Sequence, residues 1–88
     1  MNTLTSVRID KWLWAARFFK TRGAATEAVA GGKVTLNGDP AKPARAVQVG
    51  DTVEVRLPPY TWTVQVTGLG ERRGSAAVAA TLFTETDE

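Results

Sequence analysis

The sequence predicts an α+β domain in which two N-terminal helices pack on a small antiparallel or mixed sheet. Within the first twenty positions, apolar residues recur at intervals of three and four, as in an amphipathic helix. A threonine and a pair of glycines then bracket a second helical stretch. Beyond residue 50, two segments alternate apolar and polar residues, which is typical of half-buried strands. With 88 residues, the chain is long enough for a single domain, residues 1–88, with one modest core.

The first helix is expected to start at Ser6 or the residue after it and to end near Phe19. Asp10 lies in its first turn, where a carboxylate suits the positive end of the helix dipole. The residues expected to face the core are Ile9, Trp12, Leu13 and Ala16.

The other side of this helix carries Lys11, Trp14 and Phe18, an unusual set for a face meant for water. Aromatic rings in this position could stack on nucleic-acid bases or could complete the core of a small domain. The core is the preferred interpretation for Trp14, and both interpretations stay open for Phe18.

Thr21 is a good N-cap for the second helix, which should run to about Ala30 and stop at Gly31-Gly32. Residues 34–36 form a short strand that leads into Asn37-Gly38. This dipeptide favours a tight type I′ turn, because both central positions of that turn need positive φ.

The segment after the turn contains Pro40 and Pro43, so it should be irregular or lie at a sheet edge. Gly50-Asp51 marks another turn, and Pro58-Pro59 separates two strands with period-two alternation. The apolar positions of these strands are Val53, Val55 and Leu57, then Trp62, Val64 and Val66. The alternation predicts an antiparallel sheet with one face in water.

At the C-terminal end, Ser75 could cap a short Ala-rich helix ending near Phe83, and a strand is the competing interpretation. Residues 85–88 form an acidic tail that is expected to fray.

The sequence contains neither Cys nor His, which excludes disulfides, cysteine nucleophiles and the commonest zinc ligands and general base. Gly68-Leu69-Gly70 with Gly74 lacks the spacing of a dinucleotide-binding fingerprint and is interpreted as a loop. Ser6 and Ser75 have no histidine to activate them. We therefore expect no enzymatic activity, no cofactor and no metal.

The first residues lack the charged and apolar regions of a signal peptide. The longest apolar run, residues 12–16, is far too short to span a bilayer. These features favour a cytoplasmic location without a membrane partner.

The charges are segregated along the chain. Residues 1–45 contain eight Lys and Arg against three Asp and Glu, whereas residues 46–88 contain three against six. One basic side is what a phosphate-binding surface would need, although a chance distribution of twenty charges is an equal alternative.

The segment Lys20-Thr21-Arg22-Gly23 has the features that suit a phosphate group. It opens a helix whose first N–H groups lack intrahelical partners, and its glycine leaves the backbone unscreened. Two cations at this positive helix end cost a few tenths of a kcal/mol in the free protein, a cost that a bound phosphate would reverse. An ordinary solvated helix start is the alternative. Arg8, Lys11, Lys33, Lys42 and Arg45 could join the same surface or could be separate surface charges.

An ordered set of short motifs resembles the S4 RNA-binding domain. The motifs are residues 8–13, Thr21-Arg22 followed by Ala25, residues 32–34, Asn37-Gly38 and residues 49–53. The resemblance implies an S4-like (αL) core over about residues 8–57, followed by an extra strand and terminal segment over 58–84 and the acidic tail.

A second resemblance, to the bacterial fifteen-kilodalton heat-shock protein family, runs through nearly the whole chain. It rests on residues 12–18, Lys20-Thr21-Arg22, Lys42-Pro43 and Arg72-Arg73. Members of that family bind nucleic acid and associate with free large ribosomal subunits that carry stalled nascent chains, a role in the response to heat stress. They commonly continue into a long basic C-terminal extension, whereas this sequence ends in an acidic stretch.

The resemblance implies that the two-helix and hairpin face contacts RNA. Carried over to this sequence, the contact residues are Arg8, Lys11, Lys20, Thr21, Arg22, Lys33, Thr35, Asn37 and Lys42. We therefore expect a monomeric, non-catalytic protein that binds structured rRNA or tRNA in association with the large ribosomal subunit. Two alternatives remain open: an accessory RNA-binding domain that works with a separate RNA-modifying enzyme, and a protein-interaction module with an acidic partner.

Overall fold

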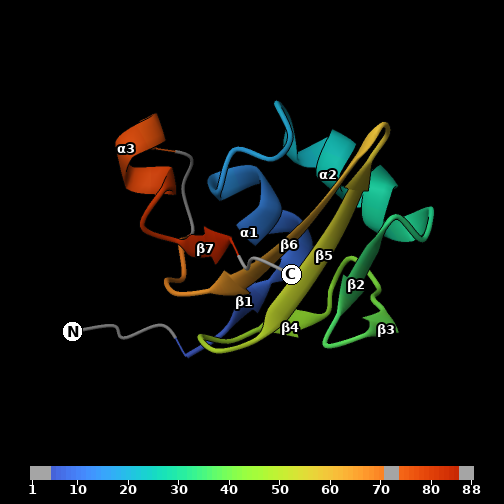
Figure 1. Cartoon of the computed structure of the whole chain (residues 1–88), viewed down its shortest axis with the longest axis horizontal. Coiled ribbons are helices and arrows are strands. Elements are labelled where there is room, and N and C mark those ends of the chain that lie inside the picture. Colours follow the sequence, from blue (N-terminus) through green and yellow to red (C-terminus); the bar gives the residue numbers. More distant parts are fainter. Residues whose placement is uncertain (1–4, 71–73, 86–88) are drawn as a thin grey trace.

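The computed structural model describes residues 5–70 and 74–85, which form a five-stranded sheet, a two-stranded sheet and three helices (Figure 1). The larger sheet has the order β3-β2-β5-β6-β7, and every pairing in it is antiparallel. The elements in chain order are β1 (Val7–Arg8), α1 (Ile9–Ala15), α2 (Arg22–Ala30), β2 (Val34–Leu36), β3 (Asp39–Pro40), β4 (Ala46–Val47), β5 (Thr52–Leu57), β6 (Tyr60–Val66), α3 (Ala76–Ala79) and β7 (Phe83–Glu85). The predicted α+β class is confirmed.

The core lies between the two long helices and one face of the larger sheet. Alternate residues of β2, β5 and β6 are buried, as the period-two pattern predicted. They pack against Ile9, Trp12 and Leu13 of α1 and against Ala25 and Val29 of α2. The other face of these strands carries hydroxyl, amide and charged side chains, so the sheet has the one open face expected from the sequence.

Helix α1 is shorter than predicted at both ends. Val7 and Arg8 pair with β4 as strand β1, so the helix begins at Ile9. It ends at Ala15, because Arg17 adopts a left-handed φ of 68° and the N–H of Phe18 donates to the carbonyl of Leu13 at 3.0 Å. Glycine or asparagine usually occupies this conformation, and the arginine gave no signal that the helix would stop.

Helix α2 and the hairpin after it agree with the sequence prediction. Thr21 is the N-cap, and its hydroxyl accepts a hydrogen bond from the N–H of Ala24 at 3.0 Å. The N–H of Lys33 returns to the carbonyl of Ala28 at 3.0 Å and closes the end of the helix. Asn37 and Gly38 have φ values of 52° and 90°, in the left-handed region that a type I′ turn requires.

Pro40 lies in β3, an edge strand, as its missing N–H requires. At the C-terminal end, the helix and strand interpretations each describe part of the segment. Ser75 caps α3, and β7 then pairs with β6. Glu85 belongs to this strand and not to the predicted tail, while residues 86–88 and Arg72-Arg73 lie outside the described residues. No helix in residues 5–70 and 74–85 is long and apolar enough to cross a membrane.

Candidate nucleic-acid interface

The start of α2 presents the segment that was predicted to bind phosphate. Lys20, Thr21, Arg22 and Gly23 are all exposed, and apart from its chain neighbours and the helix's own backbone nothing would lie within 4 Å of a Cβ added at Gly23. The helix start is capped, because the hydroxyl of Thr21 accepts a hydrogen bond from the N–H of Ala24. The N–H groups of the first two helical residues therefore remain the open donors at this end.

The buried carboxylate of Asp10 connects the first helix to the second. It is 1% exposed and accepts two hydrogen bonds from Arg8, Nε to Oδ1 at 3.1 Å and Nη2 to Oδ2 at 2.8 Å. The hydroxyl of Thr26 in α2 lies 2.9 Å from the same Oδ2 and 3.0 Å from the carbonyl oxygen of Arg22. Asp10 therefore does more than complement the helix dipole, since it holds Arg8 beside the first turns of α2.

The environment of Asp10 favours its charged form. Burial raises the pKa of this carboxyl, but the hydrogen bonds from Arg8 and Thr26, the positive charge of Arg8 and the N–H of Lys11 together outweigh burial. The pKa of Asp10 is therefore lowered from its ordinary value. Arg8 keeps a 49% exposed side chain and uses two of its N–H donors on Asp10, so other donors still face solvent.

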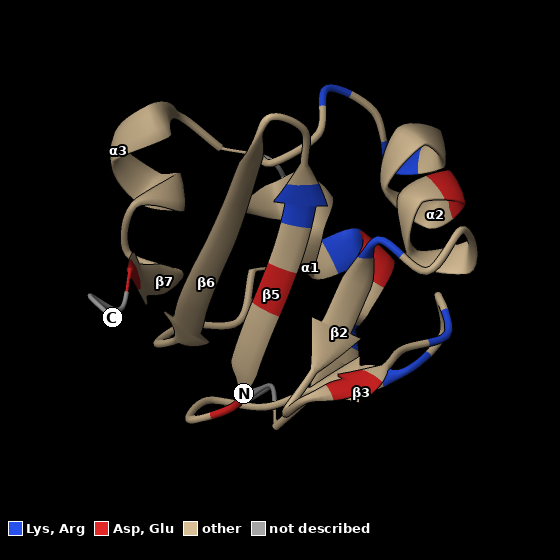
Figure 2. Ribbon diagram, turned by 45° about the vertical axis from the view of Figure 1, so that its right-hand side comes forward, with Lys and Arg blue, Asp and Glu red and all other residues tan. Residues whose placement is uncertain are grey.

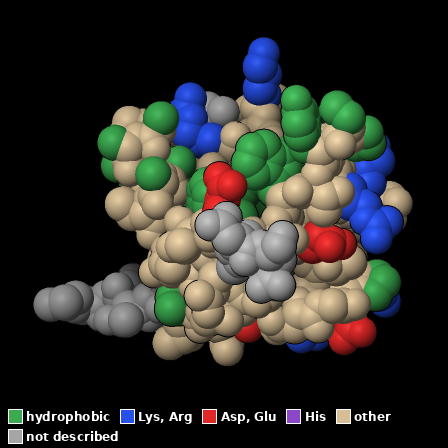
Figure 3. Space-filling view, in the orientation of Figure 1, with side chains coloured by type: hydrophobic (Ala, Val, Ile, Leu, Met, Phe, Trp, Pro, Cys, Tyr) green, Lys and Arg blue, Asp and Glu red, His purple; other side chains and the backbone are tan. Residues whose placement is uncertain are grey.

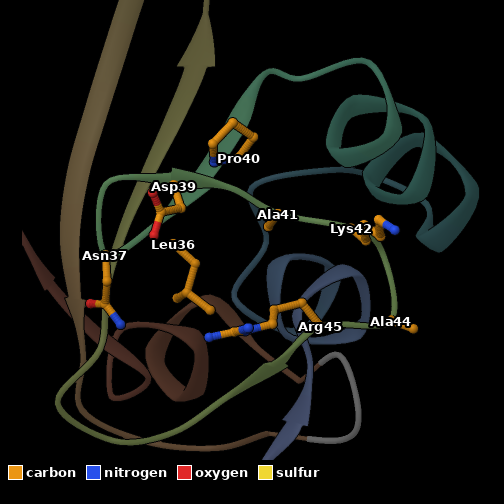
Figure 4. Close-up of a pocket in the computed structure, with 8 residues that line it drawn as sticks. All are labelled: Leu36, Asn37, Asp39, Pro40, Ala41, Lys42, Ala44 and Arg45. Atoms are coloured by element: carbon orange, nitrogen blue, oxygen red, sulfur yellow. The ribbon is translucent and has the colours of Figure 1, made fainter.

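The loop before β4 packs against the start of α1. The N–H of Ile9 donates to the carbonyl of Arg45 at 2.7 Å, and the N–H of Asp10 lies 3.4 Å from the carbonyl of Pro43. A pocket of about 420 Å³ opens between this loop and the hairpin, with Asp39, Lys42 and Arg45 in its lining. Figure 4 shows the side chain of Arg45 turned toward Asn37 and that of Lys42 directed away from the pocket. Lys42 is thus an exposed cation on the loop between β3 and β4.

The predicted residues of the hairpin have different environments. Lys33 is exposed, and Thr35 is half-buried opposite Glu54 of β5. The amide of Asn37 is engaged within the protein, since its oxygen accepts from the N–H of Thr52 at 2.9 Å and its nitrogen donates to Asp51 at 3.2 Å. Asn37 therefore holds the turn against the start of β5.

Figure 2 shows Lys and Arg on α1, at the start of α2, on the loop before α2, on the loop after β3 and at the end of β5. The ribbons of α3, β6 and β7 carry none. The structure thus brings the predicted cations to the part of the molecule formed by the helices and the hairpin. The structure also places a cation outside the predicted set, Arg56 of β5, next to Lys33: the backbone N–H of Arg56 donates to the carbonyl of Lys33 at 2.9 Å. The sequence placed this arginine only on the polar side of a strand, because adjacency to Lys33 depends on the pairing register.

The aromatic residues of α1 and of the chain after it pack at the edge of the core. The ring of Phe18 lies 4.9 Å from that of Phe83 and 6.2 Å from that of Trp12, between ring centroids. Trp14 and Phe18 are both half-buried against the core cluster, which favours the core interpretation for each. A hydrophobic patch is nevertheless visible in Figure 3, and a pocket of about 320 Å³ is lined by Phe18, Trp62 and Phe83.

Within the described part of the chain, no group of three or more acidic side chains is placed to hold a metal ion.

The sequence matches the S4 domain family over residues 7–53. The heat shock protein 15 homolog of Aeromonas salmonicida is 46% identical over 86 residues, covering 98% of this chain and 65% of that protein. Heat shock protein 15 of Escherichia coli is 48% identical over 82 residues, covering 93% and 62%. This chain thus spans a little less than two thirds of the length of these relatives. The RQC P-site tRNA stabilizing factor of Listeria monocytogenes is 36% identical over 67 residues, covering 76% and 73%.

A solved structure agrees with these matches. The trimeric structure of heat shock protein 15 from Vibrio cholerae superposes with a TM-score of 0.88 at 43% identity, covering 92% of this chain and 82% of that one. Because that relative is described as a trimer, the monomer expected here stays a prediction. Both resemblances seen in the sequence are confirmed, and this chain belongs to the S4 domain family, in the group that contains heat shock protein 15.

Proposed function

We propose that this protein binds structured RNA, without catalysis, through the face formed by the start of α1, the N-terminus of α2 and the β2–β3 hairpin. The observation that carries the proposal is the pair of exposed cations, Lys20 and Arg22, at the open end of α2. A phosphate group there would accept hydrogen bonds from the free backbone N–H groups and would be attracted by both side chains and by the helix dipole. Asp10, which accepts a hydrogen bond from Thr26 of α2, holds Arg8 beside the same helix.

In this proposal the cations make the phosphate contacts, and the other predicted residues shape the surface. The cations are Arg8, Lys11, Lys20, Arg22, Lys33 and Lys42. The hydroxyl of Thr21 caps the helix that presents its N–H groups, and the amide of Asn37 fixes the hairpin turn. The hydroxyl of Thr35 adds a donor on the adjacent strand. Such contacts recognise the shape of an RNA more than its sequence.

We further propose that the RNA is rRNA or tRNA on free large ribosomal subunits that carry stalled nascent chains, in the response to heat stress. Two names support this narrower proposal. The relatives are called heat shock proteins, and another relative is called a P-site tRNA stabilizing factor. A tRNA held on a large subunit would offer a phosphate backbone of fixed shape, which suits a rigid basic face.

The experiment is a salt titration of binding to purified tRNA and to purified large ribosomal subunits, followed by fluorescence anisotropy and co-sedimentation. If about five phosphate contacts form, the logarithm of the association constant should fall with the logarithm of salt at a slope of roughly −3 to −5. A flat salt response would reject the phosphate mechanism. Ribonuclease treatment of subunit complexes adds a second arm, since binding that survives it would favour a protein partner instead.

A further inference from the structure

We propose that Lys33 and Arg56 form a phosphate clamp across β2 and β5, which extends the RNA-binding surface onto the open face of the sheet. The clamp rests on the proposed function: Lys33 is among the residues that the resemblance indicated, whereas Arg56 is not. Arg56 lies in β5, and Lys33 is the residue directly before the neighbouring strand β2.

The pairing register places the two residues opposite each other. Val34 pairs with Val55 and Thr35 with Glu54, so the next position along pairs Lys33 with Arg56. The hydrogen bond from the N–H of Arg56 to the carbonyl of Lys33, 2.9 Å long, agrees with this register. Residues directly opposite in an antiparallel pair have Cβ atoms about 4.5–5.5 Å apart.

Both side chains point to the open face of the sheet. Val34 and Val55 are fully buried on the core face, and successive residues of a strand point to opposite faces. Arg56 therefore faces away from the helices, and its side chain is 61% exposed. The same alternation, continued through the hydrogen-bonded pair one residue before β2, places Lys33 on that face as well. An RNA strand can approach this face without displacing a helix.

The charges of the clamp are poorly compensated in the free protein. Like charges directly opposite on a sheet destabilise the pair. Arg56 contacts Glu54 at 3.7 Å between two partly exposed groups, which is a weak ion pair in water. The side chain of Lys33 has no hydrogen bond or ion pair with any residue in 5–70 and 74–85. One phosphate bound between the two cations would replace their repulsion with two charge-assisted hydrogen bonds.

The surroundings of the clamp suit an RNA backbone, with one exception. Thr61 of β6 pairs with Arg56, and Thr35 follows two positions after Lys33, so hydroxyl groups flank the cations on the same face. Glu54 is the exception, because its carboxylate repels a phosphate and competes for Arg56. Removing the charge of Glu54 should therefore strengthen RNA binding.

The clamp and the start of α2 lie at opposite ends of that helix. The N–H of Lys33 bonds to Ala28 near the end of α2, whereas Lys20 and Arg22 lie at its beginning. The nine residues of α2 give a separation of about 13 Å along the helix. A single folded RNA can contact both ends, so the two sites should contribute to one affinity.

The test measures tRNA affinity and its salt dependence for Arg56→Gln, Glu54→Gln and the control Gln65→Glu. The control changes the net charge by the same amount as Arg56→Gln and lies on the same face, but four residues farther along β6 than Thr61, roughly 13 Å away. We expect Arg56→Gln to weaken binding roughly three- to tenfold and to reduce the salt slope by about one. Glu54→Gln should tighten binding, and Gln65→Glu should change it less than twofold.

The outcomes separate the clamp from the proposed function. Unchanged affinity of Arg56→Gln, or an equal loss in Gln65→Glu, would overturn the clamp while RNA binding by the wild-type chain stands. Failure of the wild-type chain to bind RNA would overturn the proposed function itself and the clamp with it. Tighter binding by Glu54→Gln supports the clamp without depending on the stability of Arg56→Gln, because a variant that gains affinity is folded.

Discussion

The carboxylate of Asp10 in α1 lies 2.9 Å from the hydroxyl of Thr26 in α2, and this contact joins the two helices of the proposed RNA surface. The same carboxylate holds the guanidinium of Arg8 through two hydrogen bonds. One buried group thus fixes both the packing of the helices and the position of a cation. Stability and RNA binding should therefore both depend on Asp10.

We expect Asp10→Ala to lower the free energy of unfolding by about 2 kcal/mol, because charge-assisted hydrogen bonds in a buried site are lost. Urea denaturation followed by Trp fluorescence measures this change. Thr26→Val removes the hydroxyl that contacts Asp10 and the carbonyl of Arg22, leaves the contact between Asp10 and Arg8 in place, and should cost about 1 kcal/mol. Equal stability of Asp10→Ala and the wild-type protein would show that the contact adds nothing to helix packing.

The lowered pKa of Asp10 predicts a loss of stability in acid. In the unfolded chain the pKa of this carboxyl is near its ordinary value of 3.8, above its pKa in the folded protein. Between the two pKa values the unfolded state binds more protons, so the stabilisation is complete above about pH 5 and is lost as the pH falls through the folded pKa. The difference in unfolding free energy between the wild-type protein and Asp10→Asn should accordingly shrink on acidification. Urea titrations between pH 7 and pH 3 would contradict this if the difference stayed constant.

Local signals in the sequence were sufficient for α2 and the hairpin. Thr21 and the glycines after Ala30 mark both ends of the helix, and Asn37-Gly38 specifies a turn with two positive φ values. These features depend on the chemistry of one or two neighbouring residues. They could therefore be predicted without knowledge of tertiary contacts.

The features that the sequence could not predict depend on contacts between distant segments. Helix α1 ends early, at Ala15, before the left-handed Arg17, a residue with no intrinsic preference for that conformation. From the sequence alone, Asp10 is an ordinary acidic residue in the first turn of a helix, because its role in joining the two helices depends on the contact with Thr26. The adjacency of Lys33 and Arg56 follows from strand register, which the alternation pattern alone leaves undetermined.

Arg22→Ala should weaken binding to every structured RNA by a similar factor, because a phosphate contact carries no sequence information. The salt slope should become less steep by about one. Arg22→Lys is the matched control, since it keeps the charge at the start of α2 and should retain most of the affinity. Anisotropy titrations with two unrelated tRNAs and one rRNA fragment measure the effect. A loss confined to one RNA would indicate base recognition and contradict the proposed phosphate contact.

Alanine substitutions at Gly68 and at Gly23 should separate effects on stability from effects on RNA binding. At Gly68 an added Cβ would lie 2.9 Å from the carbonyl oxygen of Thr81, so Gly68→Ala should cost about 1–3 kcal/mol of stability. Gly68 is outside the proposed RNA surface, and the folded fraction of this variant should bind RNA with normal affinity. Thermal unfolding and anisotropy on the same sample measure both quantities. Weakened RNA binding by fully folded Gly68→Ala would contradict the placement of the surface.

Gly23→Ala, by contrast, should raise stability and weaken RNA binding. Outside the chain neighbours and the helix's own backbone, nothing lies within 4 Å of an added Cβ at this exposed position. Alanine also favours a helix over glycine, so stability should rise by about 0.5 kcal/mol. The new methyl group would also screen the first N–H groups of α2, which a phosphate is proposed to approach closely. Binding to tRNA should therefore weaken although the protein is more stable. If Gly23→Ala gains stability and keeps full affinity, the phosphate contacts the side chains of Lys20 and Arg22 and not the backbone of the helix.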